Sequence, residues 1–328
     1  MGKIAIIGSG SWGAALGIYL ANNGNEVKLW SFNEDEMKSI NVDRKCVFLP
    51  KAIVPEGVVC STNFEEVLEG AEIILHVTPS KFVRNTIKQY KDYVKENQML
   101  VMCSKGFEAE TNLTLDEVMK EELPNIRCGI LSGPSHAEEV SLDIPTALVV
   151  ASESEELKNA VVEVFKSPKM RLYTSKDVKG VELGAALKNI IAFCAGISVG
   201  LNLGDNTFAA LATRGLVEIA RLGTAMGGQE KTFYGLTGLG DLIVTCGSEH
   251  SRNRRAGVMI GKGHTIDEAR KEIGMTIESV DNIDVAYKLA KKYNVEMPIV
   301  EKVYEVLYNG LSPKDAVNML MTREQKSE

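Results

Sequence analysis

With 328 residues, 45% of them hydrophobic and 25% charged, the chain has the composition of a globular protein and exceeds what one hydrophobic core usually organises. Its net charge of −7 argues against a nucleic-acid-binding surface and against a basic protein of the membrane surface. We therefore expect two domains and no nucleic-acid partner, and any anionic ligand has to be met by locally placed Lys and Arg.

The cysteines and the apolar stretches indicate in which cellular compartment the protein is expected. The six cysteines are widely separated without any C-x-x-C pair, and no metal site is predicted. Cys103, Cys128 and Cys194 lie in apolar runs and are expected to be small buried side chains in a reducing compartment. The first strand starts at the N-terminus, which leaves no room for a signal peptide, and the longest apolar stretch, 190–201, is shorter than a membrane span. We expect a cytoplasmic protein without a membrane anchor.

The first fourteen residues predict a nucleotide-binding turn. An apolar, β-branched run at 1–7 leads into Gly8-Ser9-Gly10-Ser11-Trp12-Gly13, which has the pattern G-x-G-x-x-G, and a helical apolar stripe follows until Gly24. The glycines suit a tight turn, close approach of the backbone to a pyrophosphate, and close packing of helix on strand. Alone, the pattern also fits a plain turn. Its place between a strand and a helix favours dinucleotide binding.

The second predicted strand, 26–30, should end where the cofactor ribose is recognised. NAD-specific sites usually place Asp or Glu there, and NADP-specific sites offer Arg. This chain has Ser31-Phe32-Asn33 at that point, followed by the late carboxylates of Glu34 and Asp35, and no Arg occurs before Arg44. The choice between NADH and NADPH stays open.

Strands and helices continue to alternate to about residue 175. The pattern predicts strands at 58–60, 72–77, 99–103, 127–131, 146–151 and 170–173, with helices at 63–68 and 155–166. This order predicts a doubly wound, Rossmann-type parallel sheet, whose strands end at a ligand crevice. His76 is expected to pack within the sheet, while Lys105 either points into the crevice or lies on the surface. The small polar segment 132–137 suits close approach of a ligand.

Residues beyond Asp177 show helical periodicity and almost no strand pattern. We therefore predict a dinucleotide-binding domain at 1–178 and a helical substrate-binding domain at 179–328. The first helix of this second domain, 181–201, carries Lys188 on a face of small and apolar residues. Such a lysine either extends to solvent or lies in a dry cleft, where desolvation lets an amine accept a proton near neutral pH. The residues alone favour neither alternative.

Two polar segments follow this helix. A glycine-rich turn at 234–242 presents Asp241, which could pair with a buried lysine or cap the next helix. The densest basic cluster is Ser251-Arg252-Asn253-Arg254-Arg255, which suits either a phosphate clamp or a solvated helix start. Arg214 and Glu218, four residues apart, are interpreted as a structural pair.

In this order, the motifs resemble those of the bacterial NAD(P)-dependent glycerol-3-phosphate dehydrogenase family, and the similarity runs nearly end to end. The glycine motif is shared by many dehydrogenases, whereas the ordered set is specific. The matching stretches are Gly8-Ser9-Gly10-Ser11-Trp12-Gly13, Ser104-Lys105-Gly106, Ser132-Gly133-Pro134-Ser135, Leu187-Lys188-Asn189, Gly238-Leu239-Gly240-Asp241-Leu242 and Ser251-Arg252-Asn253.

The resemblance implies reversible NAD(P)-dependent reduction of dihydroxyacetone phosphate to sn-glycerol 3-phosphate, which supplies glycerophospholipid synthesis. It implies that Lys188 is the general acid and base, oriented by Asp241. The implied cofactor site comprises Gly8, Gly10, Ser11, Trp12, Gly13, Phe32, Lys105 and Ala137, with Arg252, Thr276 and Glu278 of the second domain closing over it. The implied substrate contacts are Lys105, Gly133, Ser135, Lys188, Asp241, Ser251, Arg252 and Asn253.

The chain departs from the family's common residues at Ser31-Phe32, His136, Thr276 and Ser279. Two alternative functions are considered. A β-hydroxyacid dehydrogenase also joins a Rossmann domain to helices and uses a lysine, but it would bind a carboxylate. A nucleotide-sensing protein without chemistry would need the glycine motif but not Lys188, Asp241 and the basic cluster. The oligomeric state stays open, with a homodimer as one option.

Overall fold

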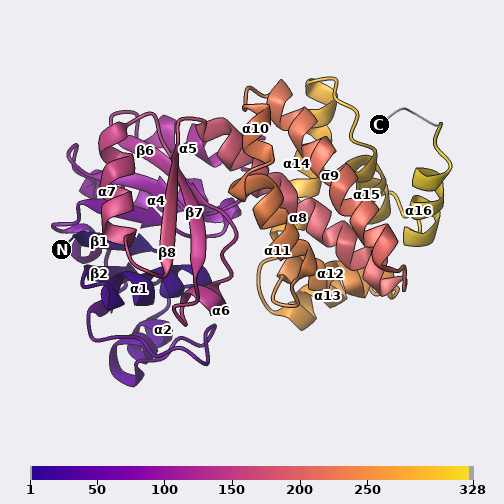
Figure 1. The fold of residues 1–328 in the computed structure, drawn as a ribbon. Coiled ribbons are helices and arrows are strands. Elements are labelled where there is room, and N and C mark those ends of the chain that lie inside the picture. Colours follow the sequence, from indigo (N-terminus) through magenta and orange to yellow (C-terminus); the bar gives the residue numbers. More distant parts are fainter. Residues whose placement is uncertain (1, 325–328) are drawn as a thin grey trace. The chain divides into compact units, whose positions relative to one another are not determined.

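The computed structural model describes residues 2–324, so Met1, where the first predicted strand begins, lies outside the described residues. The chain forms two compact units (Figure 1). Unit 1 comprises the described part of Met1–Glu108 together with Leu113–Glu182. Unit 2 comprises Ala109–Asn112 and the described part of Leu183–Glu328.

Unit 1 contains a single sheet, in which eight strands of the described chain follow the order β3-β2-β1-β4-β5-β6-β7-β8. The strands are β1 (Lys3–Ile7), β2 (Glu26–Trp30), β3 (Val58–Ser61), β4 (Ile73–His76), β5 (Met99–Met102), β6 (Arg127–Ser132), β7 (Thr146–Ala151) and β8 (Met170–Ser175). The predicted Rossmann-type sheet is confirmed, with one difference: β7 runs antiparallel to β6. The connection between them holds only the four-residue helix α6 (Ala137–Val140), whereas parallel strands are usually joined through a longer crossover helix that packs on the sheet.

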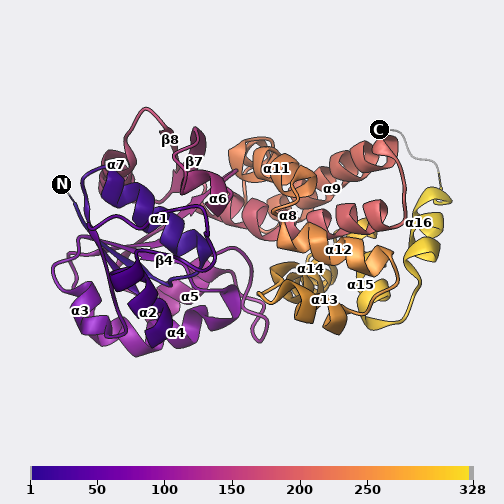
Figure 2. The same cartoon turned by 90° about the horizontal axis from the view of Figure 1, so that it is seen from below.

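Helices cover both faces of this sheet. They are α1 (Ser11–Asn22), α2 (Glu34–Lys38), α3 (Phe64–Leu68), α4 (Val83–Tyr90), α5 (Leu115–Glu122), α6 and α7 (Glu155–Phe165). Figure 2 shows α1 and α7 on one side of the strands and α3, α4 and α5 on the other. Side chains alternate between the faces of a strand, so Ile4 and Ile6 join the core under α1 and α7, while Ala5 and Ile7 join the opposite core.

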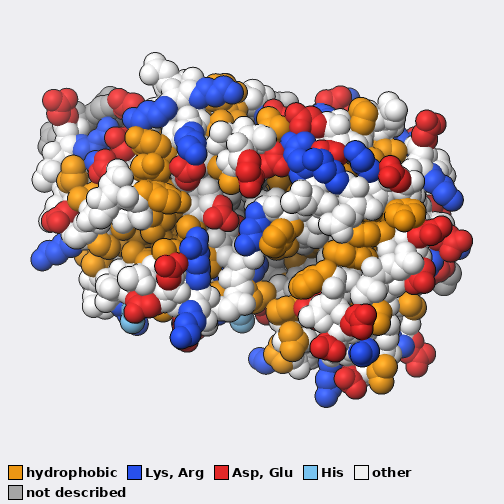
Figure 3. Space-filling model, turned by 180° about the vertical axis from the view of Figure 1, so that it is seen from behind, with side chains coloured by type: hydrophobic (Ala, Val, Ile, Leu, Met, Phe, Trp, Pro, Cys, Tyr) orange, Lys and Arg blue, Asp and Glu red, His pale blue; other side chains and the backbone are white. Residues whose placement is uncertain are grey.

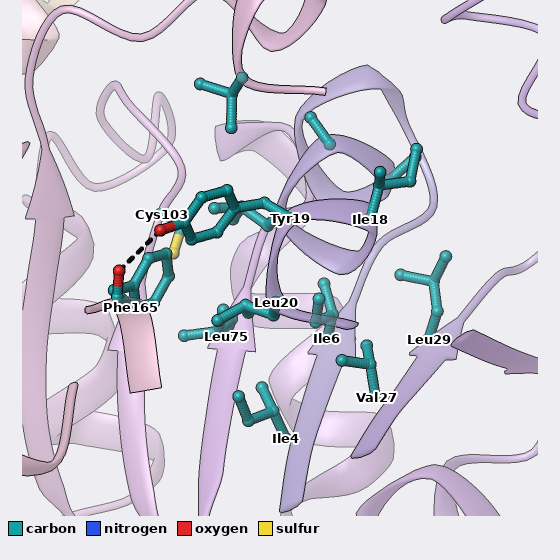
Figure 4. Packing of buried hydrophobic residues seen from close by; sticks show 14 of the residues in the cluster. Ile4, Ile6, Ile18, Tyr19, Leu20, Val27, Leu29, Leu75, Cys103 and Phe165 are labelled. Atoms are coloured by element: carbon teal, nitrogen blue, oxygen red, sulfur yellow. Dashed lines mark hydrogen bonds between the residues drawn. The ribbon is translucent and has the colours of Figure 1, made fainter. Parts of the chain in front are cut away.

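The core under α1 and α7 joins segments far apart in the sequence. The rings of Tyr19 and Phe165 stack with their centroids 6.0 Å apart. The Tyr19 hydroxyl donates a hydrogen bond to the Phe165 carbonyl oxygen at 2.7 Å (Figure 4). Burial raises the pKa of Tyr19, so this hydroxyl keeps its proton. The first and seventh helices are thereby fixed to one another.

Unit 2 is helical, as predicted. Its helices are α8 (Val178–Gly200, which begins in unit 1), α9 (Asp205–Ala225), α10 (Glu230–Phe233), α11 (Asp241–Gly247), α12 (Arg252–Gly261), α13 (Ile266–Ile273), α14 (Glu278–Lys292), α15 (Pro298–Tyr308) and α16 (Pro313–Met321). By length and composition α8 could cross a membrane, but 89% of its most apolar window is buried inside the protein. That burial is typical of the core helix of a globular protein.

Helix α12 lies directly against α8 because both helices carry glycine at the contact. A Cβ atom on Gly196 would meet the Arg254 carbonyl oxygen at 2.0 Å, and one on Gly257 would meet the Phe193 carbonyl oxygen at 1.9 Å. The backbones therefore touch where side chains would normally separate them. This contact holds α12 close to the C-terminal part of α8.

Glu218 on α9 has a structural role that differs from the predicted pair with Arg214. Its carboxylate accepts hydrogen bonds from the backbone N–H groups of Ile299 at 2.8 Å and Val300 at 3.2 Å, at the start of α15. Burial raises the pKa of Glu218 to about 7. The Arg214 side chain is exposed. Glu218 thus joins α9 to α15.

Candidate active site

The glycine turn after β1 has a backbone shape that requires its glycines. Gly8 has a φ of +123°, which L side chains rarely adopt. A Cβ on Gly13 would lie 1.8 Å from the Gly8 carbonyl oxygen, so α1 starts in contact with the strand. A Cβ on Gly10, in contrast, would have no atom within 4 Å. The backbone at Gly10 is therefore open to a ligand.

The start of α1 suits the pyrophosphate of a dinucleotide. Ser11 is the first residue of the helix, no side chain caps it, and its first turn holds no acidic residue. The backbone N–H groups of a helix start attract phosphate, and nothing in this first turn competes for them or repels it. Ser11 and Trp12 are partly exposed beside the turn. These residues fit the dinucleotide predicted from the sequence.

Strands β1, β2 and β4 end at the same level beside this turn, because Ile7 is in register with both Trp30 and His76. Beyond β2, the Phe32 side chain is 77% exposed. His76 packs within the sheet as predicted, where Nδ1 lies 3.0 Å from the Tyr90 hydroxyl. Burial lowers the pKa of His76 to about 3, so its ring is neutral at physiological pH.

Strands β5 and β6 bring three of the predicted site residues together. The Lys105 Nζ donates a hydrogen bond to the Gly133 carbonyl oxygen at 3.4 Å, and the Ser135 hydroxyl donates to the same oxygen at 3.0 Å. Lys105 therefore lies at the crevice end of the sheet. Ala137 is buried at the start of α6.

In unit 2, Lys188 is buried and engaged with Asp241. Only 4% of Lys188 and 1% of Asp241 is exposed, and Nζ donates a hydrogen bond to the Asp241 Oδ1 at 2.7 Å. The Thr245 hydroxyl lies 2.5 Å from the same nitrogen and donates to the Asp241 carbonyl oxygen at 2.6 Å. Of the two alternatives for Lys188, the structure shows the buried position with polar partners. Of the two alternatives for Asp241, it shows the pair with the buried lysine, because Gly240 is the N-cap of α11 and no side chain caps that helix.

Two further contacts connect the start of α12 to the start of α14, and a third connects α8 to α14. Arg252 donates a guanidinium N–H to the Thr276 carbonyl oxygen at 3.1 Å, and the Asn253 Oδ1 accepts from the Ser279 N–H at 3.0 Å. Glu278 accepts a hydrogen bond from Asn189, the neighbour of Lys188, at 3.1 Å. These predicted residues therefore belong to one hydrogen-bonded group within unit 2.

Ser251 and Thr245 differ from what the sequence analysis predicts. The Ser251 hydroxyl caps α12 by accepting the Arg254 N–H at 3.2 Å, so this predicted substrate contact also has a structural role. Thr245 contacts the lysine but was not predicted. Its spacing of four residues after Asp241 places both side chains on one face of α11, and this spacing was the available signal.

The charged side chains and thiols outside these groups are distributed as follows. Lys and Arg side chains are interspersed with Asp and Glu over the face seen in Figure 3. Within residues 2–324, no group of three His, Cys, Asp or Glu side chains is placed to hold a metal ion. Cys103 and Cys194 are buried, as predicted, whereas Cys128 is partly exposed and burial raises its pKa to about 12.

Comparison with known proteins finds relatives that match along nearly the whole chain. The family described as NAD-dependent glycerol-3-phosphate dehydrogenase matches through its N-terminal part at residues 3–158 and its C-terminal part at 177–318. A glycerol-3-phosphate dehydrogenase of Fusobacterium nucleatum, named for NAD(P)+, is 49% identical over 100% of this chain and 99% of its own length. One of Clostridium perfringens, with the same name, is 46% identical over 100% and 99%.

A solved structure gives the same result for the fold. The crystal structure of glycerol-3-phosphate dehydrogenase from Coxiella burnetii superposes with a TM-score of 0.95 at 38% identity, covering 98% of this chain and 99% of that one. The fold of the chain is therefore shared with that structure. The chain belongs to the NAD-dependent glycerol-3-phosphate dehydrogenase family.

Proposed function

We propose that the chain interconverts dihydroxyacetone phosphate and sn-glycerol 3-phosphate, with Lys188 as the residue that carries the proton. The observation that supports this role is the burial of Lys188 beside Asp241, with 2.7 Å between amine and carboxylate. When bound, NAD(P)H supplies the hydride that adds to C2 of dihydroxyacetone phosphate. The family name and the glycine turn support this choice of cofactor.

Lys188 handles the proton that balances the hydride. During reduction, its ammonium form donates a proton to the oxygen that develops negative charge at C2, and its positive charge stabilises that oxygen. During oxidation, the neutral amine removes the hydroxyl proton. Asp241 and Thr245 fix the position of Nζ through contacts of 2.7 Å and 2.5 Å. The proton given up is replaced from solvent after each turnover.

Arg252 and Asn253 are proposed to hold the substrate phosphate. A guanidinium has five N–H donors, and the hydrogen bond from Arg252 to the Thr276 carbonyl oxygen uses one of its nitrogens. Asn253 is held by the Ser279 N–H, which leaves its amide N–H groups to face a ligand. Phosphate held away from the reacting carbon would position C2 for the hydride, so these contacts serve orientation as well as affinity. Lys105, Gly133 and Ser135 are the proposed substrate contacts of unit 1.

The test is NAD(P)H consumption with dihydroxyacetone phosphate, compared with short β-keto acids under the same conditions. We expect turnover with dihydroxyacetone phosphate and little or none with the keto acids, because the basic residues suit a dianionic phosphate. Turnover of keto acids alone would favour the β-hydroxyacid dehydrogenase alternative. Binding of NAD(P)H without turnover of any carbonyl would favour the nucleotide-sensing alternative.

The remaining features stay predictions. The domain limits 1–178 and 179–328, the closing of Arg252, Thr276 and Glu278 over the cofactor, a cytoplasmic location and a homodimer belong to this proposal. Light scattering on the purified chain measures its mass in solution and distinguishes a monomer from a dimer. The product is a building block of glycerophospholipids, which supports a role in their synthesis.

A further inference from the structure

A carboxylate from α2 reaches the end of β2, where the sequence itself has none. The Glu36 Oε2 lies 2.5 Å from the Ser9 hydroxyl oxygen and 3.1 Å from the Ser31 hydroxyl oxygen. The two hydroxyl oxygens are 2.8 Å apart. Ser31 directly follows β2, and Ser9 lies between the first two glycines of the turn. The three side chains therefore join the ribose end of the sheet to the phosphate end.

The local chain holds Glu36 in this place. The Asn33 side chain accepts the backbone N–H groups of Asp35 at 2.8 Å and Glu36 at 3.2 Å, and so opens α2. Within this first turn, Glu34 and Asp35 are exposed, while Glu36 is half-buried and turned back to the strand. Glu34 and Asp35, which follow β2 most closely in sequence, are thus exposed and form no hydrogen bond with the end of that strand. The acidic residue that bonds the strand end is five residues beyond Ser31.

Within residues 2–324, no Lys or Arg side chain forms an ion pair with the Glu36 carboxylate. Lys38, the nearest basic residue in sequence, lies 4.0 Å from Glu34 instead. Arg44 donates its guanidinium to the Val58 carbonyl oxygen at 3.1 Å. A site for a 2′-phosphate needs Arg or Lys at this point, whereas a carboxylate accepts a hydrogen bond from a ribose 2′-hydroxyl.

We propose that Glu36 makes this enzyme select NADH over NADPH. The inference rests on the proposed function for the identity of the ligand and extends it to the cofactor form. Glu36 would accept the hydroxyl of the adenosine ribose in NADH, and its negative charge would repel the 2′-phosphate of NADPH. Because the carboxylate is bonded to Ser9 and Ser31, it cannot swing away to relieve that repulsion without breaking both contacts.

The experiment compares NADH and NADPH with the wild-type chain, Glu36→Gln and the matched control Glu34→Gln. Dissociation constants come from quenching of protein fluorescence, and kcat/KM comes from dihydroxyacetone phosphate reduction. We expect the wild type to favour NADH by about tenfold or more, the size expected of charge repulsion at a partly exposed site. Glu36→Gln should narrow this ratio about tenfold, mainly by tightening NADPH, while Glu34→Gln keeps it.

Other outcomes separate the two proposals. Preference of the wild type for NADPH, or equal weakening of both cofactors by Glu36→Gln, would overturn the role of Glu36; the second result would mark it as a scaffold residue. Raised salt should reduce the wild-type ratio but not that of Glu36→Gln, because screening acts on the charge. If no carbonyl is turned over while the binding ratio follows the expectation, the proposed function fails and the selectivity of Glu36 stands.

Discussion

The glycine turn of unit 1 and the lysine group of unit 2, which consists of Lys188, Asp241 and Thr245, are built in opposite ways. The turn is one contiguous stretch whose shape is set by backbone atoms, through the positive φ of Gly8 and the contact of Gly13 with the Gly8 carbonyl. The lysine group joins α8 to α11, and side-chain hydrogen bonds hold it across 53 residues of sequence. The turn is therefore vulnerable at its glycines, and the lysine group at single polar atoms.

The largest effect should follow from the loss of the amine. For Lys188→Met we expect a fall of about 10²–10⁴ in kcat for dihydroxyacetone phosphate reduction, the usual contribution of a general acid or base. NAD(P)H affinity should be retained, because the glycine turn is untouched. Steady-state kinetics and cofactor titration measure the two effects. Lys314→Met, at an exposed position on α16, is the control, and unchanged turnover of Lys188→Met would rule out the lysine as proton carrier.

The next largest effect should come from Asp241→Asn, which leaves the buried ammonium without its carboxylate. We expect a loss of about 3–5 kcal/mol in the free energy of unfolding, measured by denaturant titration. The alkaline limb of the pH–rate profile should also move to lower pH, because the carboxylate favours the ammonium form of its partner. A variant with wild-type stability and an unshifted profile would contradict the structural pairing.

In the glycine turn, the space available for a Cβ atom should decide how a substitution changes the stability. Gly13→Ala places a Cβ 1.8 Å from a backbone oxygen, so we expect a loss of about 1–3 kcal/mol in unfolding free energy along with weaker cofactor binding. Gly10→Ala meets open space and should keep the stability while still weakening NAD(P)H binding. Unfolding curves and cofactor titration of both variants make the comparison. Equal stability of the two would show that the close contact at Gly13 relaxes without cost.

A pH-dependent effect concerns Glu182, a buried carboxyl near the start of α8 that belongs neither to the glycine turn nor to the Lys188–Asp241 pair. It accepts the Asp116 N–H at 2.7 Å, and burial, followed by repulsion from Asp116, raises the pKa of Glu182 to about 8. Between its ordinary value of 4.5 and about 8, the folded chain binds more protons at this group than the unfolded chain does. The contribution of Glu182 to stability therefore falls as pH rises through this window, by on the order of 1 kcal/mol per pH unit.

Replacement by Gln should remove that slope. The measurement is the free energy of unfolding of Glu182→Gln and wild type at several pH values between about 5 and 8. Glu56→Gln, at an exposed position, is the control and should leave the slope in place. Parallel curves for wild type and Glu182→Gln would contradict a raised pKa at this carboxyl.

Much of the fold was predictable because its signals are local. Alternating apolar runs and turn residues predict β2 and β7 with the same first and last residues as in the structure. The change to helical periodicity marks the start of α8. The antiparallel direction of β7 was not predicted. A strand pattern has the same appearance in either direction, and the connection after β6 contains only the short helix α6 instead of a long crossover helix.

The candidate site was predictable only where its residues are close together in the sequence. The glycine turn needs only its six residues and their neighbours, so its place was clear. For Lys188 the residues of α8 left solvent and cleft equally open, because the partner that decides lies on α11. Glu36 was missed since its distance from β2 in sequence exceeds the usual spacing, and only the helical turn opened by Asn33 brings it back. Thr245 was missed although its spacing was available.

The hydrogen bond from Tyr19 to the Phe165 carbonyl joins two residues separated by 146 positions. During synthesis on the ribosome, α1 therefore emerges long before the helix that completes its side of the sheet. The apolar face formed by β1, β2 and α1 stays open to other chains throughout that interval. Chains truncated before α7 should for this reason aggregate rather than fold, although they contain the whole nucleotide-binding turn.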